Sequence, residues 1–148
     1  MCEVGTDHAG QGFSQGFSKE AGVEAIRAER EYLGASILAE ARWAGEDLWV
    51  VLTGGTRPHV GSVILTVPRP SLRDPSKISS TSSILNRPGH MDERPGRALA
   101  ERLAEEFDCN VALACGIHYD NLAEDQVERI ETLCTELGQE LLAGLKGA

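Results

Sequence analysis

Three of the four histidines lie where the chain is expected to bend, each within two residues of a glycine or a proline. These are His59, His90 and His118. Histidine is the commonest metal ligand and the usual acid–base group near neutral pH. If the fold brings the three rings together near Asp92 or Asp120, they could hold iron, manganese or zinc. Their spacing matches no local metal motif, so three separate loop histidines with ordinary hydrogen bonds are the alternative.

The segment 54–97 is positively charged within an acidic chain. It carries seven basic and three acidic residues, a balance of +4, whereas the whole chain has a formal net charge of −9. A basic, hydroxyl-rich segment shaped by glycine and proline indicates an anion site. An ordinary surface loop with scattered arginines is the alternative. The basic residues are Arg57, Arg69, Arg73, Lys77, Arg87, Arg94 and Arg97, and the acidic ones are Asp74, Asp92 and Glu93.

Two stretches in this segment could bind a phosphate group. Gly54, Gly55 and Thr56 follow an apolar run and could offer backbone N–H groups, with the charge of Arg57 beside them. The hydroxyl cluster 79–83 offers short side-chain donors. Both have plain structural explanations, because a turn needs glycine and a short helix is capped by serine or threonine.

The elements that must position these residues are mostly strands. Apolar runs bounded by turn residues predict strands near 32–43, 47–53, 61–67 and 109–118. The first two form an expected antiparallel hairpin, although alanines leave a helix open for its first arm. The continuous apolar run 109–118 is typical of a central strand covered on both faces. Residues 23–31 fit either a polar helix or a frayed strand.

Two helices are expected in the second half of the chain. Residues 92–107 place Leu99, Leu103 and Phe107 on one face, and residues 123–145 carry a longer apolar stripe. The proline-rich span 68–90 is too interrupted for a regular element, apart from one helical turn near 80–85. The Gly/Ser-rich residues 1–22 predict a disordered tail, which leaves residues 23–148 as a single domain.

The composition excludes several classes of protein. Acidic balance and few aromatic residues argue against a nucleic-acid partner, and no apolar run is long enough to span a membrane. The four cysteines form no C-x-x-C pair, so reduced thiols in a cytoplasmic protein are expected. Those in the apolar run 109–118 should have raised pKa values and little reactivity.

Four motifs in order carry a family resemblance over roughly residues 30–145. They are Thr-Gly-Gly-Thr-Arg-Pro-His-Val-Gly-Ser-Val (53–63), Val-Pro-Arg-Pro-Ser-Leu-Arg-Asp-Pro-Ser (67–76), Ser-Ser-Thr-Ser-Ser-Ile-Leu-Asn-Arg-Pro-Gly-His (79–90) and Gly-Ile-His-Tyr-Asp (116–120). Together they resemble the small D subunit of gallate decarboxylase, a family also described as LpdD-like prenylated-flavin chaperones.

The resemblance implies an α+β fold, mainly an antiparallel sheet with helices, similar to proteasome-assembly chaperones and commonly dimeric. It implies an accessory protein of a UbiD-type aromatic acid decarboxylase that binds prenylated FMN and assists its maturation or delivery. Its partners would be the decarboxylase large subunit, a flavin prenyltransferase and a second copy. The cofactor-binding residues are then expected to be Gly54, Gly55, Thr56, Arg57, Arg69, Ser82 and Ser83, and the ligands of an iron or manganese ion His59, His90 and His118.

Two other functions fit the same residues. A stand-alone metal-dependent enzyme would use the three histidines to activate water. A purely structural subunit would stabilise the decarboxylase without touching the cofactor. Retention of the flavin by the purified protein, or its absence, separates these alternatives.

Overall fold

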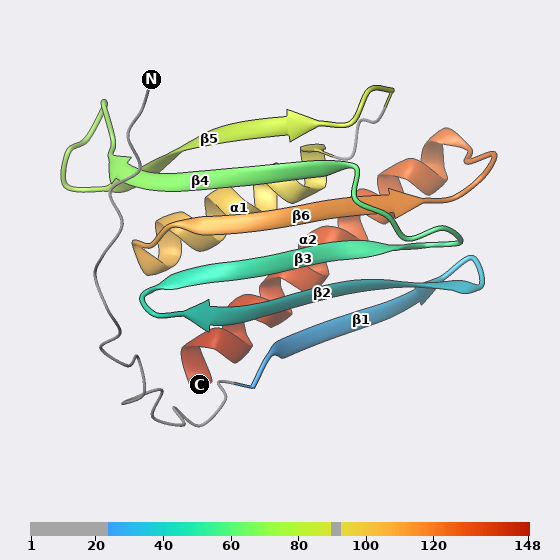
Figure 1. Cartoon of the computed structure of the whole chain (residues 1–148), viewed down its shortest axis with the longest axis horizontal. Helices are drawn as coiled ribbons and strands as arrows, with labels where there is room; N and C mark the ends of the chain where they lie inside the picture. Colours follow the sequence, from blue (N-terminus) through green and yellow to red (C-terminus); the bar gives the residue numbers. More distant parts are fainter. Residues whose placement is uncertain (1–23, 90–92) are drawn as a thin grey trace, which may run out of the picture.

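A computed structural model describes residues 24–89 and 93–148, which form six strands and two helices (Figure 1). The elements are β1 (Ile26–Tyr32), β2 (Ala35–Ala44), β3 (Asp47–Gly55), β4 (Ser62–Pro70), β5 (Ile78–Asn86), α1 (Glu93–Phe107), β6 (Val111–His118) and α2 (Glu124–Gly147). The expected disordered tail, residues 1–22, lies outside the described residues.

The strands form one sheet in the order β1-β2-β3-β6-β4-β5. Four of its five strand pairs are antiparallel, and only β3 and β6 run parallel. The predicted α+β class with a mainly antiparallel sheet is therefore confirmed, as are the hairpin of β2 and β3 and both helices. The parallel pair brings the carboxyl ends of β3 and β6 to the same edge of the sheet, because parallel strands end on the same side.

The core lies between the helices and one face of the sheet (Figure 1). Alternate residues of the strands point toward the helices, as the period of two in a strand requires. Leu48, Leu52 and Ile64 from the strands and Leu103 and Leu137 from the helices are fully buried there. Helix α1 packs against β4, β5 and β6, and α2 packs against β1 and β2.

For residues 23–31, where the sequence fits either a helix or a strand, the structure shows strand β1 from Ile26. Two other expectations about the strands are wrong. The span 68–90 was expected to lack a regular element, but β4 continues to Pro70 and β5 occupies Ile78–Asn86. Strand β6 is central, yet only one of its faces is covered, since Ala112 is exposed on the other.

Three polar contacts join β5 to α1, beside the partly buried Ile84. The Ser80 hydroxyl donates to Glu105 at 2.9 Å, the Ser82 hydroxyl donates to Glu101 at 3.1 Å, and the Asn86 amide donates to Glu93. Because β5 presents hydroxyls to carboxylates, its sequence lacks the apolar alternation that marks a buried strand. The serine cluster thus has a structural role in the sheet.

The cysteines of the described residues behave as predicted. Cys109, Cys115 and Cys134 are buried, and burial raises the pKa of Cys109 to about 11 and that of Cys134 to about 12. Their thiols therefore stay protonated and unreactive near neutral pH. Among the described residues, neither helix is apolar enough over a sufficient length to cross a membrane.

Candidate functional site

The candidate site lies at the carboxyl ends of β3 and β6, where the two strands pair. Gly55 of β3 pairs with His118 of β6, and the Thr56 N–H donates to the His118 carbonyl oxygen at 2.8 Å. Gly55 has φ of +81°, and a Cβ there would come within 2.0 Å of that same oxygen. Only glycine allows this close approach, which leads the chain from β3 across the end of β6.

The returning loop places His59 beside His118. The Gly61 N–H donates to the Cys115 carbonyl oxygen at 2.8 Å, so the loop lies directly over β6. A Cβ at Gly116 would meet the His59 carbonyl oxygen at 1.8 Å. With glycine at this position the loop fits, and the ring centroids of His59 and His118 lie 6.2 Å apart in an edge-to-face arrangement.

Arg57, His118 and Asp120 form a contact cluster at this end of the sheet. Arg57 Nη2 lies 2.7 Å from Asp120 Oδ1 and 2.7 Å from His118 Nε2, which lies 3.0 Å from Asp120 Oδ1. A neutral ring nitrogen accepts from Arg57, whereas a protonated one donates to Asp120, so the two contacts of Nε2 alternate. The partner of Nε2 therefore depends on whether this nitrogen carries a hydrogen.

The cluster is charged and accessible to solvent. The hydrogen bond from His118, followed by the positive charge of Arg57, holds the pKa of Asp120 below its ordinary value. The Arg57 side chain is 67% exposed, so its guanidinium can reach a ligand in solution. An exposed pair of this kind contributes little stability, which leaves its donors available for exchange with another anion.

An apolar cavity of about 290 Å³ shares His118 with this cluster. Its walls come from α1, α2 and the connection after β6, and most of them are hydrophobic. The polar groups at its rim are His118 and an ion pair of Arg94 and Glu131 at 3.7 Å. A small number of polar groups around an apolar cavity is typical of ligand sites. The apolar lining residues are Pro95, Ile117, Tyr119, Leu122, Val127 and Ile130.

Tyr119 fixes the backbone between the cluster and the cavity. Its side chain is buried, its hydroxyl donates to the Ala35 carbonyl oxygen at 3.2 Å, and its ring packs edge-to-face on Tyr32. Because Tyr119 lies between His118 and Asp120, this anchor orients both side chains toward solvent.

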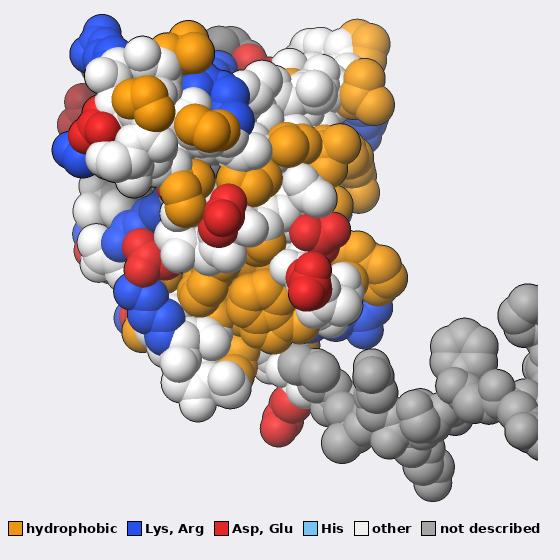
Figure 2. Space-filling model, turned by 90° about the vertical axis from the view of Figure 1, so that its left-hand side faces the viewer, with side chains coloured by type: hydrophobic (Ala, Val, Ile, Leu, Met, Phe, Trp, Pro, Cys, Tyr) orange, Lys and Arg blue, Asp and Glu red, His pale blue; other side chains and the backbone are white. Residues whose placement is uncertain are grey.

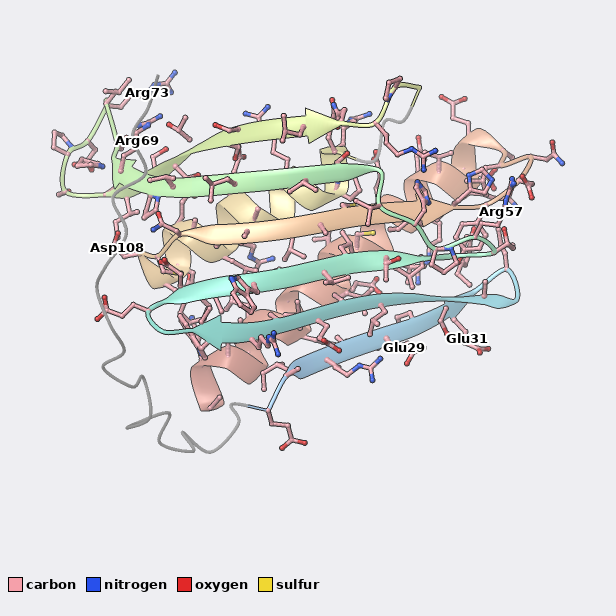
Figure 3. The ribbon with its side chains drawn as sticks, in the orientation of Figure 1. Glu29, Glu31, Arg57, Arg69, Arg73 and Asp108 are labelled. Atoms are coloured by element: carbon pink, nitrogen blue, oxygen red, sulfur yellow. The ribbon has the colours of Figure 1, made fainter. Side chains whose placement is uncertain are left out.

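The basic residues of the segment 54–97 do not form one patch. Figure 3 shows Arg57 at one end of the sheet and Arg69 and Arg73 at the other. Figure 2 faces that second end and shows Lys and Arg side chains gathered at its top. On α1, Arg94 and Arg97 pair with Glu131 and Glu101. The sequence thus predicted a shared anion site from charges that the fold disperses.

The other predicted cofactor residues separate in the same way. Arg69 donates to the Thr81 hydroxyl at the far end, and Ser82 lies on the helix side of β5, where it also contacts Thr66. Ser83 is exposed on the opposite face. Of the seven predicted residues, Arg57 contacts the side chains of His118 and Asp120, and Thr56 donates to the His118 carbonyl oxygen. Gly54 and Gly55 lie beside the cluster in the backbone of β3.

The expected phosphate loop at Gly54–Thr56 needs correction. The Thr56 N–H and hydroxyl both donate to the His118 carbonyl oxygen, so neither is directed at a ligand. Gly54 belongs to β3, where a Cβ would meet the Ser36 carbonyl oxygen at 2.4 Å. These glycines allow close packing of the backbone.

Two of the three predicted metal ligands lie within the described residues. His59 and His118 lie together, but no group of three or more His, Cys, Asp or Glu side chains in residues 24–89 and 93–148 could hold a metal ion. His90, the third predicted ligand, lies outside the described residues.

Sequence reasoning missed the cavity. Val127 begins the apolar stripe predicted for residues 123–145, yet it is 44% exposed and lines the cavity. A signal was present, since Val127 begins that stripe one turn before the first fully packed residue, Ile130. An apolar residue at a helix start beside a histidine-bearing loop is consistent with a cavity wall.

Comparison with known proteins identifies the class to which this fold and site belong. The family model of the prenylated flavin chaperone LpdD-like domain matches residues 31–146. The chain therefore belongs to the LpdD-like prenylated flavin chaperone family, as its motifs predicted.

A particular relative agrees with this assignment. Protein LpdD of Lactiplantibacillus plantarum is 24% identical over 116 residues, which cover 78% of this chain and 82% of that protein. A solved chain from a chaperone complex for yeast 20S proteasome assembly is also similar, with 16% identity and a TM-score of 0.46 over 81% of this chain and 98% of that chain.

Proposed function

We propose that this chain is an accessory protein that binds prenylated FMN and assists its maturation or its delivery to a UbiD-type aromatic acid decarboxylase. Membership of the family supports the ligand class. The structural observation that carries the proposal is the apolar cavity beside the cluster of Arg57 and His118. An amphiphilic anion needs both features, because its phosphate requires cationic donors and its prenylated ring system requires an apolar surface.

In this proposal Arg57 and His118 contact the phosphate and the cavity takes the apolar part of the ligand. Without ligand, the Arg57 guanidinium donates to Asp120, and the phosphate takes the place of this carboxylate when it binds. Prenylated FMN supplies the redox and decarboxylation chemistry when it is bound to its enzyme, while this chain's residues bind it and exclude water from it.

Flavin retention tests the binding part of the proposal. Purified protein is mixed anaerobically with reduced prenylated FMN, separated from free ligand, and examined by absorbance. Arg57→Ala and Val127→Glu should each lower retention about tenfold or more, since one removes a charge-assisted contact and the other places a charge in the cavity. Arg73→Ala is the matched control, because this arginine lies at the opposite end of the sheet (Figure 3). Equal retention by all four proteins would refute the site.

Transfer to the enzyme tests the delivery part. Loaded protein is added to the cofactor-free large subunit of a UbiD-type decarboxylase, and decarboxylation is followed over time. Delivery predicts faster activation than an equal concentration of free cofactor gives, and Arg57→Ala should remove the advantage. If the loaded protein activates the enzyme no faster than free cofactor does, the chain binds the cofactor but does not deliver it. That result would contradict the delivery part of the proposal.

The remaining expectations stay predictions. They are a flavin prenyltransferase as a second partner, a cytoplasmic location and an iron or manganese ion at His59, His90 and His118. Elemental analysis of anaerobically purified wild type and His118→Ala tests the ion, and equal metal content in both would refute it. The homodimer also stays a prediction.

A further inference from the structure

A second cavity lies between α1 and α2, beside the one that contains His118, and has a volume of about 280 Å³. Leu99 and Cys134 are buried and form an apolar floor. A Cβ at Gly138 would lie 3.0 Å from Leu99 Cδ1, so glycine at this position lets Leu99 lie against the backbone of α2. An apolar floor below a few polar groups is typical of ligand sites. The polar groups at the rim are Arg94, Arg102, Glu131 and Thr135.

The two cavities form one groove between the helices. Arg94, Pro95 and Glu131 line both of them. On α2 the other lining residues of the His118 cavity precede Glu131, and those of the second cavity follow it. Both helices run from the side of the sheet where β6 ends toward the opposite side (Figure 1). The second cavity therefore continues the His118 cavity along the helices, away from the His118 cluster.

A loose ion pair divides the groove. Arg94 Nη1 lies 3.7 Å from Glu131 Oε1, and the two side chains are 72% and 43% exposed. Exposed pairs of this kind contribute little to stability, and exposed side chains change rotamer rapidly. The division can therefore open without movement of the helices. Each cavity alone is slightly below the range of about 300–1,000 Å³ that is usual for small-molecule sites, whereas the joined cavities fall within it.

Arg102 is the available cation at the far end of the groove. Its side chain is exposed and makes no ion pair or hydrogen bond with another residue in the ranges 24–89 and 93–148. It lies eight residues after Arg94 on α1, which is a rise of about 12 Å along the helix axis. The planar guanidinium carries its donors in one plane, a geometry that suits acceptor atoms on the edge of a flat ring. Hydrogen bonds and charge at the ring nitrogens of a flavin tune its electronics.

Building on the proposed function, which supplies the ligand class, we propose that the prenylated flavin extends past Arg94 and Glu131 into the second cavity. There Arg102 donates to the acceptor atoms at the edge of the ring system. Cations then contact both ends of the ligand, since Arg57 binds the phosphate, and the apolar floors of the two cavities lie between them. Once the ligand separates the ion pair, Arg94 is a further donor, whereas the Glu131 carboxylate repels the anionic ligand.

Two ligands that differ only in the phosphate distinguish the ends of the groove. Dissociation constants are measured anaerobically for reduced prenylated FMN and for its dephosphorylated form. Arg102→Ala should weaken the binding of both about tenfold, because it removes a charge-assisted contact with the ring system. Arg57→Ala should weaken only the phosphorylated ligand. If Arg102→Ala also weakens only the phosphorylated ligand, the phosphate lies at Arg102 and the proposed orientation is wrong.

Glu131→Gln should have the opposite effect. It should strengthen the binding of both ligands about threefold, because it removes a repulsive charge and releases Arg94 from its ion pair. Glu136→Gln is the matched control, since Glu136 pairs with Arg129 at 3.2 Å on the same helix and lies outside both cavities. Weaker binding by Glu131→Gln would contradict the separation of the ion pair.

A bulky side chain tests whether the ligand enters the second cavity. Ala98 and Ala143 are both exposed on helices, but Ala98 lines this cavity and Ala143 does not. Ala98→Trp should therefore weaken the binding of both ligands about tenfold or more, and Ala143→Trp should leave it unchanged. Wild-type affinity in either Ala98→Trp or Arg102→Ala would overturn the inference and leave the proposed function standing. A wild-type protein that binds neither ligand would overturn both.

Discussion

Gly116 lies directly beneath the backbone of His59, and a Cβ at this glycine would come within 1.8 Å of the His59 carbonyl oxygen. The contact joins a strand in the centre of the sheet to the loop that carries Arg57 and His59. It explains why two histidines 59 positions apart in the chain lie side by side. The position of the site is therefore set by backbone packing as well as by side-chain contacts.

Gly116→Ala should displace this loop. The added methyl group meets backbone on the loop, which cannot move aside without shifting the whole turn, and overpacking of this kind costs about 1–3 kcal/mol. Urea unfolding should show the loss, and NMR should show a larger separation of the His59 and His118 rings. Gly147→Ala is the control, because a Cβ there meets nothing within 4 Å. A wild-type spectrum for Gly116→Ala would contradict the expectation.

Neighbouring serines of β5 should respond differently to truncation. Ser82 lies between the buried Thr66 hydroxyl, at 2.8 Å, and Glu101 of α1, whereas Ser83 is exposed on the open face. Ser82→Ala should lower the free energy of unfolding by about 1 kcal/mol, and Ser83→Ala should change it by less than about 0.5 kcal/mol. Denaturant unfolding of both variants measures the difference. A larger effect of Ser83→Ala would show that the polar layer is unimportant.

Sequence patterns predicted most of the sheet because most strands face an apolar core. Strand β5 was missed because its inward residues, Ser80 and Ser82, contact carboxylates of α1. Prolines also concealed the end of β4. Pro68 and Pro70 lie beyond Thr66, the last residue of β4 that pairs with β6, so the edge of β4 facing β6 is unpaired there and tolerates proline.

The sequence predicted only part of the candidate site. Arg57, His59 and His118 follow the ends of strands that become neighbours, so the sequence could indicate their convergence. Arg69 has the same charge and stands among similar prolines, but eight residues of β4 carry it to the other end (Figure 3). Residue type does not specify the direction in which a strand runs. Only the sheet order and register do.

The thiol of Cys134 should make stability depend on pH in the alkaline range. Burial raises its pKa to about 12, whereas an unfolded cysteine titrates near about 8.5. Above that value the unfolded state loses a proton that the native state keeps, so its contribution to stability is complete below about pH 8.5 and falls as pH rises. The slope contributed is at most about 1.4 kcal/mol per pH unit.

Urea unfolding of wild type and Cys134→Ala between pH 7.5 and 10 isolates this contribution. Other groups also titrate in this range, so the readout is the difference between the two slopes. The wild-type free energy of unfolding should fall more steeply, even though the alanine variant is less stable at pH 7.5 because of the lost packing. Parallel curves would show that the native thiol titrates normally.

Asp120 should report on the cluster at acidic pH. Its pKa is lowered mainly by the hydrogen bond from His118 and then by the charge of Arg57, so the carboxylate keeps its contacts below the usual carboxyl range. With a depressed native pKa, the contribution of these contacts is present above about pH 4 and is lost as pH falls through the native value. NMR titration should show the pKa of Asp120 rising in both single variants, and more in His118→Ala than in Arg57→Ala. If only Arg57→Ala raises the pKa of Asp120, the ion pair with Arg57 and not the hydrogen bond from His118 lowers that pKa. His118 would then accept from Arg57 and not donate to Asp120.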